Sequence, residues 1–382
     1  MNRLSPVRTR RVCWDRSCQR DGQHARPVGV ACLLFAGAML TASPAAAQWK
    51  PDTASLATQP IEVNARRIVN FSKNGTPFVN ARLAWRGGLV LTSPSKNFGG
   101  WSGLALSRDG ADLVAVSDSG LWMTARVAYD GERLQGLRSA RIGALQTVKG
   151  KPLTRQRDRD VEAIAIASGT PTKGTAYIAF EQHDRIGVFA ISETGLARPK
   201  SYLAMPKEAA RMRMDGIESL TVLAGGPRQG ALVAFAENPL RGETQHRGWI
   251  WIGGEPRGFT VAGPADFSIT DAASLPDGRV LLVERRFRWL EGLRVRLRLI
   301  PADAIKPGAT ATGDVLLEAD TAQEIDNLEG LAVSENAAGE TILTLVSDDN
   351  FNGFLQRTVL LQFALTDEPE AKAASNAPAI KR

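Results

Sequence analysis

Short apolar runs separated by turn residues recur along the chain, and this pattern of hydrophobic and polar positions predicts β-hairpins. Each of five copies opens with a small or acidic residue, continues through an apolar run, a turn and a second apolar run, and ends in an acidic residue. The copies span residues 102–118, 162–181, 218–237, 271–284 and 329–348. Runs of this length that are rich in Val, Ile and Leu are typical of buried strands.

The spacing of the copies predicts a β-propeller. Their first residues, Ser102, Glu162, Glu218, Asp271 and Glu329, are 60, 56, 53 and 58 residues apart. A recurrence of about 57 residues suits a four-stranded blade, and blades repeated around an axis leave few exposed sheet edges. Further strands are expected over residues 83–92 and 358–365, where they would close the ring. We therefore predict an all-β fold, a single-domain β-propeller over residues 48–366, with six blades or, alternatively, five.

The two ends of the chain depart from this pattern. Residues 1–47 combine a basic stretch, an apolar run from Val28 to Leu40 and three alanines, Ala45 to Ala47, which is typical of a signal peptide cleaved before Gln48. The mature chain is therefore expected in the periplasm or outside the cell, after export by the general or the twin-arginine route. Residues 367–382, rich in Ala, Pro and charge, are expected to be disordered.

Removing the first 47 residues changes the charge of the chain. They hold seven arginines against two aspartates, so the net charge of +7 becomes +2, and the argument for a nucleic-acid partner is lost. All three cysteines lie in the same segment, so the mature chain has no disulfide and no cysteine metal ligand. Its apolar runs fall short of the roughly 20 residues of a membrane span. We predict a monomer with no membrane span.

The propeller geometry predicts that acidic residues of different hairpins meet. The start of each innermost strand and the end of the strand beside it lie at the same end of the central channel. Nine carboxylates are expected there: Asp118, Glu162, Glu181, Glu218, Glu237, Asp271, Glu284, Glu329 and Asp348. Carboxylates crowded near one axis need cations or protons, and cages of oxygen ligands suit Ca²⁺. These nine residues are our predicted metal ligands; the alternative is that they close turns and cap strands in water.

Three of these acids are also the predicted catalytic residues. Glu162, Glu218 and Glu329 would activate water beside a bound cation. Side chains that follow second strands could neutralise the acids or receive an anionic substrate. These substrate-binding candidates are Arg285, Arg286, Arg288 and His183.

Ser102 is a further substrate-binding candidate, as a small residue at the channel mouth. A catalytic triad of Ser102, His183 and an acid is the less favoured interpretation. The segment from Gly100 to Leu104 lacks the last glycine of a nucleophile elbow, and a propeller has no strand-to-helix turn to hold such a serine.

Several segments resemble the phytase-like propeller family, whose members are described as having esterase-like activity. They are residues 86–93, 98–118, 160–164, 215–220, 271–287 and 326–363, which together cover most of the mature chain. The sequences VERRF, at residues 283–287, and SDDNF, at residues 347–351, are the most specific of them. The resemblance implies a secreted propeller that hydrolyses esters, with phosphate esters among the candidate substrates, and that shares an acidic channel mouth with the Ca²⁺-dependent propeller phytases.

Two functional hypotheses follow from these observations. The first is an exported hydrolase that acts on a small-molecule ester or phosphoester at a Ca²⁺-binding channel mouth. The second is a non-catalytic periplasmic binding propeller in which the cation is structural. Stabilisation by Ca²⁺ without turnover would favour the second, because a ligand that binds only the folded state raises its stability.

Overall fold

The computed structural model describes residues 56–212 and 216–366, in which the regular structure is almost entirely β. Residue contacts divide the chain into two units, Met1–Ala46 and Ala47–Arg382, and the described residues all belong to the second. The predicted signal peptide (residues 1–47) and the predicted tail (367–382) lie outside the described residues. Within the described ranges, no helix combines the length and the hydropathy needed to cross a bilayer.

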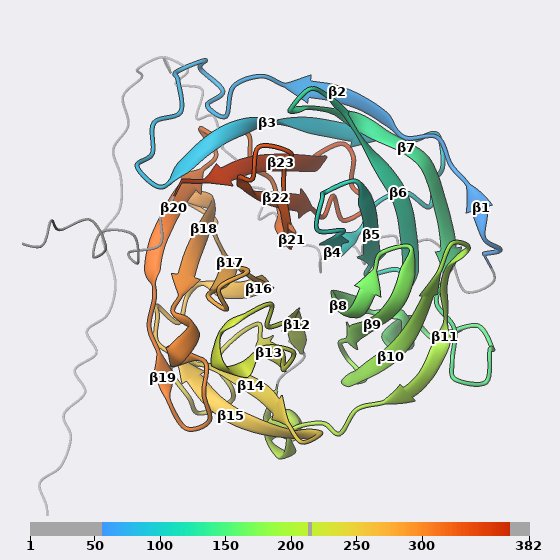
Figure 1. Ribbon diagram of the computed structural model, residues 1–382, viewed down its shortest axis with the longest axis vertical. Helices are drawn as coiled ribbons and strands as arrows, with labels where there is room; N and C mark the ends of the chain where they lie inside the picture. The colour runs from blue at the N-terminus through green and yellow to red at the C-terminus, as the bar shows by residue number, and fades with distance from the viewer. Residues whose placement is uncertain (1–55, 213–215, 367–382) are drawn as a thin grey trace, which may run out of the picture. The chain divides into compact units, whose positions relative to one another are not determined.

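Five sheets surround a central axis as the blades of a β-propeller, each written here from its inner to its outer strand (Figure 1). Blade 1 contains β4 (Trp101–Leu106), β5 (Asp112–Ser117), β6 (Leu121–Asp130), β7 (Arg133–Ala144) and β1 (Gln59–Pro60). Blade 2 contains β8 (Val161–Thr170), β9 (Lys173–Phe180), β10 (Arg185–Ser192) and β11 (Gly195–Tyr202). Blade 3 contains β12 (Ile217–Val222), β13 (Leu232–Ala236), β14 (His246–Ile252), β15 (Glu255–Val261) and β19 (Thr310–Ala311).

The last two blades complete the ring. Blade 4 contains β16 (Ser268–Ser274), β17 (Val280–Arg288), β18 (Gly292–Ile300) and β20 (Asp314–Asp320). Blade 5 contains β21 (Leu328–Glu335), β22 (Thr341–Ser347), β23 (Thr358–Leu365), β3 (Leu83–Thr92) and β2 (Asn64–Ile68). The connections include one short helix and three 3₁₀ turns: α1 (Gln156–Arg159), η1 (Lys207–Arg211), η2 (Gly226–Arg228) and η3 (Ala302–Ala304).

The propeller prediction is confirmed, with the alternative count of five blades rather than six. The strands predicted over residues 83–92 and 358–365 do form, but they pair with each other inside blade 5, with Val90 opposite Val359. In Figure 1 the early strand β3 therefore lies beside the late strand β23. Segments from both ends of the described chain complete one blade, so they do not add a sixth.

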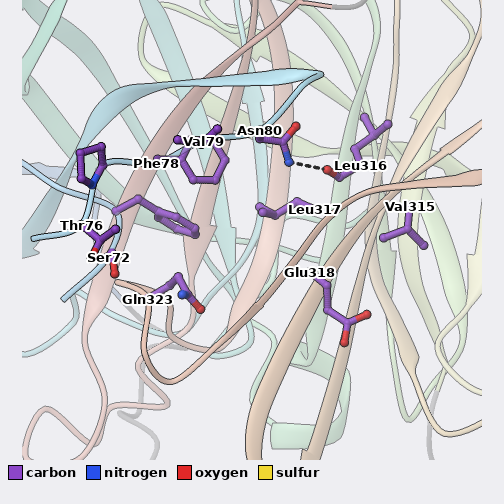
Figure 2. Close-up of a pocket in the computed structure, with 12 residues that line it drawn as sticks. Ser72, Thr76, Phe78, Val79, Asn80, Val315, Leu316, Leu317, Glu318 and Gln323 are labelled. Carbon is purple, nitrogen blue, oxygen red and sulfur yellow. Dashed lines mark hydrogen bonds between the residues drawn. The ribbon is translucent and has the colours of Figure 1, made fainter. Parts of the chain in front are cut away.

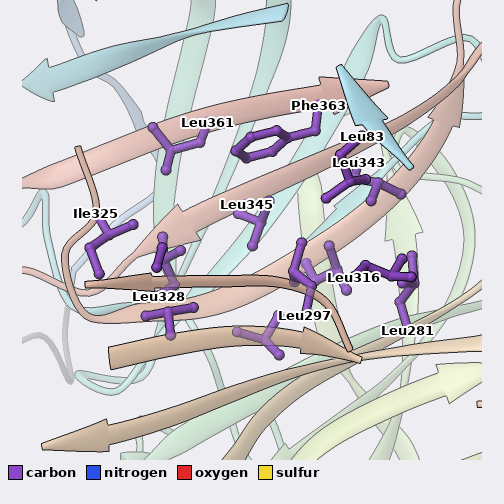
Figure 3. Close-up of a cluster of buried hydrophobic side chains, with 14 of the residues drawn as sticks. Leu83, Leu281, Leu297, Leu316, Ile325, Leu328, Leu343, Leu345, Leu361 and Phe363 are labelled. Atoms are coloured by element: carbon purple, nitrogen blue, oxygen red, sulfur yellow. The ribbon is translucent and has the colours of Figure 1, made fainter. Parts of the chain in front are cut away.

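The core of the propeller lies between blades. The inner strands contact one another in a closed ring, in the order β4, β8, β12, β16, β21 and back to β4. Five clusters of buried apolar side chains fill the spaces between neighbouring blades, and Figure 3 shows the one between blades 4 and 5. Because the inner strands of each blade are buried on both faces, they read as continuous apolar runs rather than as an alternating pattern.

Candidate functional site

A β-bulge occurs at the same place in all five inner strands. Each ladder skips one residue, after its first pair in blades 1, 2, 3 and 5 and after its second pair in blade 4. The skips lie between residues 101 and 103, 161 and 163, 217 and 219, 269 and 271, and 328 and 330. The skipped residues are Ser102, Glu162, Glu218, Thr270 and Glu329. A bulge disrupts the ladder locally and redirects the side chain of the extra residue. The structure thus places these five side chains at equivalent positions, which we call the bulge position.

A second equivalent position follows the strand next to each inner strand. In four blades the backbone N–H at this position donates to the carbonyl of the residue two before the bulge: Asp118 to Gly100 (3.0 Å), Glu181 to Asp160 (2.9 Å), Glu237 to Gly216 (3.2 Å) and Asp348 to Asn327 (2.9 Å). In blade 4 the corresponding residue, Ser268, is paired with Arg285. We call Asp118, Glu181, Glu237, Arg285 and Asp348 the strand-end position.

The predictions for Asp271 and Glu284 in blade 4 are wrong. The observed register of this blade differs by one residue from the register that would bring these two acids to the rim. Thr270, and not Asp271, occupies the bulge position, while Glu284 is still paired inside the ladder, opposite Ile269. A shift of one residue turns a strand side chain to the opposite face. The Asp271 carboxylate accepts backbone hydrogen bonds from Ala272 (2.8 Å) and Leu331 (2.6 Å).

Glu284 is likewise held by neighbours within its own sheet. Its Oε1 accepts a short hydrogen bond from Arg298, and its Oε2 lies 4.0 Å from Arg296. The structure therefore does not bring Asp271 and Glu284 together with the other predicted ligands. Both are buried acids that already have partners in or beside blade 4.

The other acids converge as the propeller geometry predicts. We call this group the acidic rim, and it consists of Asp118, Asp160, Glu162, Glu181, Glu218, Glu237, Glu329 and Asp348. Burial first, and then repulsion from neighbouring rim acids, raises the pKa of Glu162 well above its usual value. The same two causes raise the pKa of Glu218 and of Asp348. These shifts show that the rim carboxylates lie close enough to disfavour one another's charge.

Glu329 has a raised pKa that lies near neutrality. Burial raises its pKa to about 7, although Arg285 opposes the shift and Asn327 donates a hydrogen bond to the carboxylate. Both donors reach the same oxygen, Oε1, at 3.0 Å from Arg285 and 2.7 Å from Asn327. A carboxyl group with a pKa near neutrality can both take up and release a proton at physiological pH.

Three of the rim acids form a compact group of possible metal ligands. Asp160, Glu162 and Glu181 each offer an oxygen, and these oxygens lie within 4.8 Å of one another. We call these three residues the blade-2 triad. Glu162 is only 7% exposed, and within the described ranges no hydrogen-bond donor reaches its carboxylate. A buried carboxylate without a donor needs a proton or a cation.

Asp160 is a possible metal ligand that the strand pattern did not predict. It comes directly before β8, and its side chain accepts a short hydrogen bond from Gln182. The signal for it in the sequence is a second acid in the DVEAI segment, two positions before Glu162. This segment therefore supplies two possible ligands, and Glu181, directly after β9, supplies the third.

A close contact between blade 5 and blade 1 holds two other rim acids in place. The Oδ1 atom of Asp349 accepts hydrogen bonds from the backbone N–H groups of Gly100 (3.0 Å) and Phe351 (3.1 Å). A Cβ on Gly100 would lie 2.3 Å from Oδ1 of Asp118, and Gly100 has φ +66°, so a larger residue cannot fit there. The SDDNF loop thus packs on the FGG segment and joins Asp348 to Asp118 across the blade junction.

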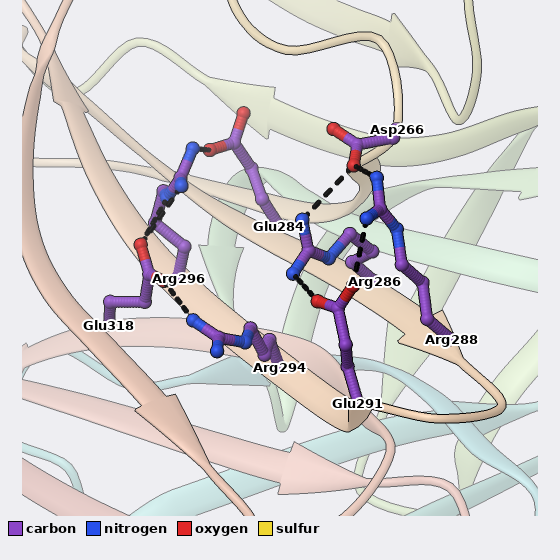
Figure 4. A network of polar contacts seen from close by, with 8 residues as sticks. All are labelled: Asp266, Glu284, Arg286, Arg288, Glu291, Arg294, Arg296 and Glu318. Carbon is purple, nitrogen blue, oxygen red and sulfur yellow. Dashed lines mark hydrogen bonds and ion pairs between the residues drawn. The ribbon is translucent and has the colours of Figure 1, made fainter.

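Of the predicted cationic residues on β17, Arg285 faces the rim and its neighbours do not. Arg286 pairs with Asp266 (3.1 Å) and Glu291 (2.6 Å), and Arg288 pairs with the same two acids (Figure 4). Because side chains alternate along a strand, Arg285 and Arg286 project to opposite faces of β17.

Ser102 and His183 do not form a nucleophile and base pair in the described residues. Ser102 is buried and its hydroxyl donates to the Gly100 carbonyl at 3.4 Å. The His183 side chain is 66% exposed, and its Nδ1 lies 3.2 Å from Asp158. The two residues therefore have separate partners. The candidate catalytic groups are the carboxylates of the rim.

Below the rim the channel is narrow, and most of the side chains around it are apolar. Three consecutive residues from each inner strand, 104–106, 164–166, 220–222, 272–274 and 331–333, line a space of about 140 Å³. A larger hollow of about 370 Å³ lies at the outside of blades 4 and 5, between residues 71–80 and β20 (Figure 2). Its lining includes the carboxylate of Glu318, which is already paired with Arg294 and Arg296. The rim is therefore the better candidate site.

These features define a five-bladed β-propeller with a carboxylate-rich rim at one end of its central channel. The chain belongs to the phytase-like family, because a family profile described as "Phytase-like: Esterase-like activity of phytase" matches residues 96–351, more than half of its length. The match includes the whole acidic rim. A search of curated proteins finds no match. The resemblance seen in the sequence is thus confirmed, and the family is one that suggests a hydrolase-type propeller.

Proposed function

We propose that this protein is an exported, metal-assisted hydrolase that cleaves an ester or phosphoester at the acidic rim. The observation that carries the proposal is the blade-2 triad, in which the buried Glu162 carboxylate has no hydrogen-bond donor and lies beside Asp160 and Glu181. Carboxylate oxygens are the ligands that Ca²⁺ prefers, and an extracytoplasmic location would expose the rim to it.

The residues present fit such an ion. Asp160, Glu162 and Glu181 would hold it, with water or substrate oxygens completing the six to eight ligands that Ca²⁺ takes. When bound, the ion would polarise the carbonyl or phosphoryl oxygen of the substrate. A cation would also relieve the repulsion that raises the pKa of Glu162.

Glu329 is the proposed general base. Its Oε1 is held by Arg285 and Asn327, so Oε2 is the oxygen that takes the proton of the attacking water. The water oxygen bonds to the acyl carbon or the phosphorus, the bond to the leaving oxygen breaks, and Oε2 returns the proton to that oxygen. A pKa of about 7 allows both transfers near neutral pH. Arg285, at the same carboxylate, would face an anionic group of the substrate.

The shape of the channel restricts how the substrate approaches. A space of about 140 Å³ lined by apolar strand residues lies below the rim, so charged groups would reach the acids from the open end. This access suits a small-molecule ester or a terminal phosphate group. Pockets for drug-sized ligands are typically larger, about 300 to 1,000 Å³.

The proposal can be tested with purified full-length protein. We expect hydrolysis of p-nitrophenyl acetate or p-nitrophenyl phosphate that requires Ca²⁺, is abolished by a chelator, and falls at least about 100-fold in Glu162→Gln and Glu329→Gln. Glu318→Gln, which alters an outer acid paired with arginines, serves as the matched control and should keep full activity. Equal rates in the wild type and both rim variants would rule out catalysis at the rim.

A binding propeller with a structural cation is the second candidate. The blade-2 triad joins the segment before β8 to the residue after β9, so a bound cation would also stabilise this blade. Stabilisation by Ca²⁺ without turnover of either substrate would support this function in place of hydrolysis.

A further inference from the structure

Blade 4 is the exception among the five blades at the rim. The other blades place a carboxylate at the strand-end position, whereas blade 4 places the guanidinium of Arg285 there and a hydroxyl, that of Thr270, at the bulge position. The Thr270 hydroxyl is used locally, because it donates to the Leu328 carbonyl at 2.9 Å. Blade 4 therefore contributes a positive charge and no carboxylate to the rim.

Arg285 connects the rim acids of the two blades beside its own. Its Nη1 lies 3.0 Å from Oε1 of Glu329 in blade 5, and its Nη2 lies 3.6 Å from Oε1 of Glu237 in blade 3. A short hydrogen bond to Asn327 fixes the guanidinium further. Burial alone would lower the pKa of Arg285, but Glu329, Glu237, Glu218 and Asp348 together raise it above its usual value. The guanidinium thus lies among four rim carboxylates.

We propose that Arg285 takes the place of a second metal ion and so limits the rim to one ion, at the blade-2 triad. This inference rests on the proposed function, since it assumes that the triad binds a cation. The acids around Arg285 would otherwise form a second oxygen cage in the rim. A guanidinium supplies the positive charge permanently, whereas the occupancy of a metal site depends on the free concentration of the ion.

A second observation supports a cation-binding role for this part of the rim. Glu218 is 9% exposed, and among the described residues no hydrogen-bond donor reaches its carboxylate. Burial and then the charges of Glu162 and Glu237 raise its pKa. If Arg285 became an acid, Glu218, Glu237, Glu329 and Asp348 would surround a fifth carboxylate. That arrangement can persist only with added protons or cations.

The test is the number of Ca²⁺ ions bound by the full-length protein, measured by isothermal titration calorimetry and equilibrium dialysis at pH 8. Arg285→Asp gives blade 4 the residue type found at the strand-end position of blades 1 and 5. Arg286→Asp is the matched control, because it makes the same change of charge one residue away on the opposite face of β17. We expect one ion in the wild type and in Arg286→Asp, and two in Arg285→Asp.

The outcomes separate this inference from the proposed function. One ion in Arg285→Asp, or two in the wild type, would overturn the role of Arg285 and leave the metal site intact. No binding in the wild type would overturn both.

Arg285→Gln covers the case in which Arg285→Asp does not fold. It removes the charge without adding an acid, and circular dichroism reports whether it folds. We expect saturating Ca²⁺ to raise its Tm by more than it raises that of the wild type. An equal rise in the two proteins would contradict the proposal.

Discussion

The two ends of the inner strands have opposite chemistry, although they belong to the same five strands. At the start of each strand the bulge position directs Ser102, Glu162, Glu218, Thr270 or Glu329 toward the rim. Two residues further along, the ladders are regular and mainly Leu, Ile, Ala and Val line a space of about 140 Å³. The bulge is thus the boundary between the acidic rim and the apolar part of the inner strands. We call this part, residues 104–106, 164–166, 220–222, 272–274 and 331–333, the hub.

This difference shows how the fold can accommodate a site that lowers its stability. The rim buries carboxylates whose charges oppose one another, which raises the pKa values of Glu162, Glu218 and Asp348 and disfavours folding when they are ionised. The hub contributes the stability, through apolar clusters between every pair of neighbouring blades. Changes in the hub should therefore alter stability regardless of Ca²⁺, while changes at the rim should depend on Ca²⁺ and pH.

The largest effect is expected from truncating a hub residue. Leu104 is 2% exposed, and the position of a Cβ on Gly330 lies 3.0 Å from the Leu104 Cβ, so the surroundings are tightly packed. Leu104→Ala should lower the free energy of unfolding by about 4 kcal/mol, because it leaves a cavity between blades. Urea denaturation with and without Ca²⁺ measures this loss, which should be equal in the two conditions.

Leu290→Ala is the control for that experiment. Leu290 is 93% exposed, and its truncation should change stability by less than about 0.5 kcal/mol. If Ca²⁺ restored most of the stability lost in Leu104→Ala, the separation between hub and rim would be wrong.

Much of the hub could be predicted from the sequence, because buried strands in a propeller read as apolar runs at a regular spacing. The five hairpins and the all-β fold followed from that pattern alone. The blade count did not, because β3 and β23 are far apart in sequence and pair only in three dimensions. An isolated strand pattern does not say whether it starts a new blade or completes an existing one.

The rim was predictable only in part. In blade 2 the acids at positions 162 and 181 reach the rim, as expected from the pattern, and Asp160 reaches it as well although the pattern did not predict it. In blade 4 the pairs Thr270–Asp271 and Glu284–Arg285 each offer two registers, and the acidic residues pointed to the wrong one. Because a shift of one residue reverses the face, such an error exchanges a carboxylate for a guanidinium.

The next largest effect concerns pH. Glu329 has a folded-state pKa of about 7 against an ordinary value of 4.5, so the folded protein binds more protons than the unfolded chain between these pH values. Its contribution to stability is therefore present at low pH and is lost as pH rises from 4.5 to 7, by at most about 3 kcal/mol. Ca²⁺ favours the ionised form, so its stabilising effect should be larger at pH 8 than at pH 5.

Glu329→Gln isolates this contribution, since glutamine does not titrate. Denaturant unfolding between pH 4.5 and 8 should show that the wild type loses stability relative to Glu329→Gln as pH rises. Burial also lowers the pKa of His246 to about 4. Because His246 is present in both proteins, its titration does not affect the difference between their stabilities. Parallel pH profiles for the two proteins would show that Glu329 does not titrate as the structure implies.

The smallest effect is expected at the contact that joins blade 5 to blade 1. Asp349→Ala leaves the N–H groups of Gly100 and Phe351 without their acceptor, which should lower the free energy of unfolding by about 1 kcal/mol. Asp349→Asn keeps the Oδ1 acceptor, so it should restore the stability. Urea denaturation distinguishes the two variants. If Asp349→Asn were as damaging as Asp349→Ala, the charge of Asp349, and not its role as an acceptor, would be what the rim requires.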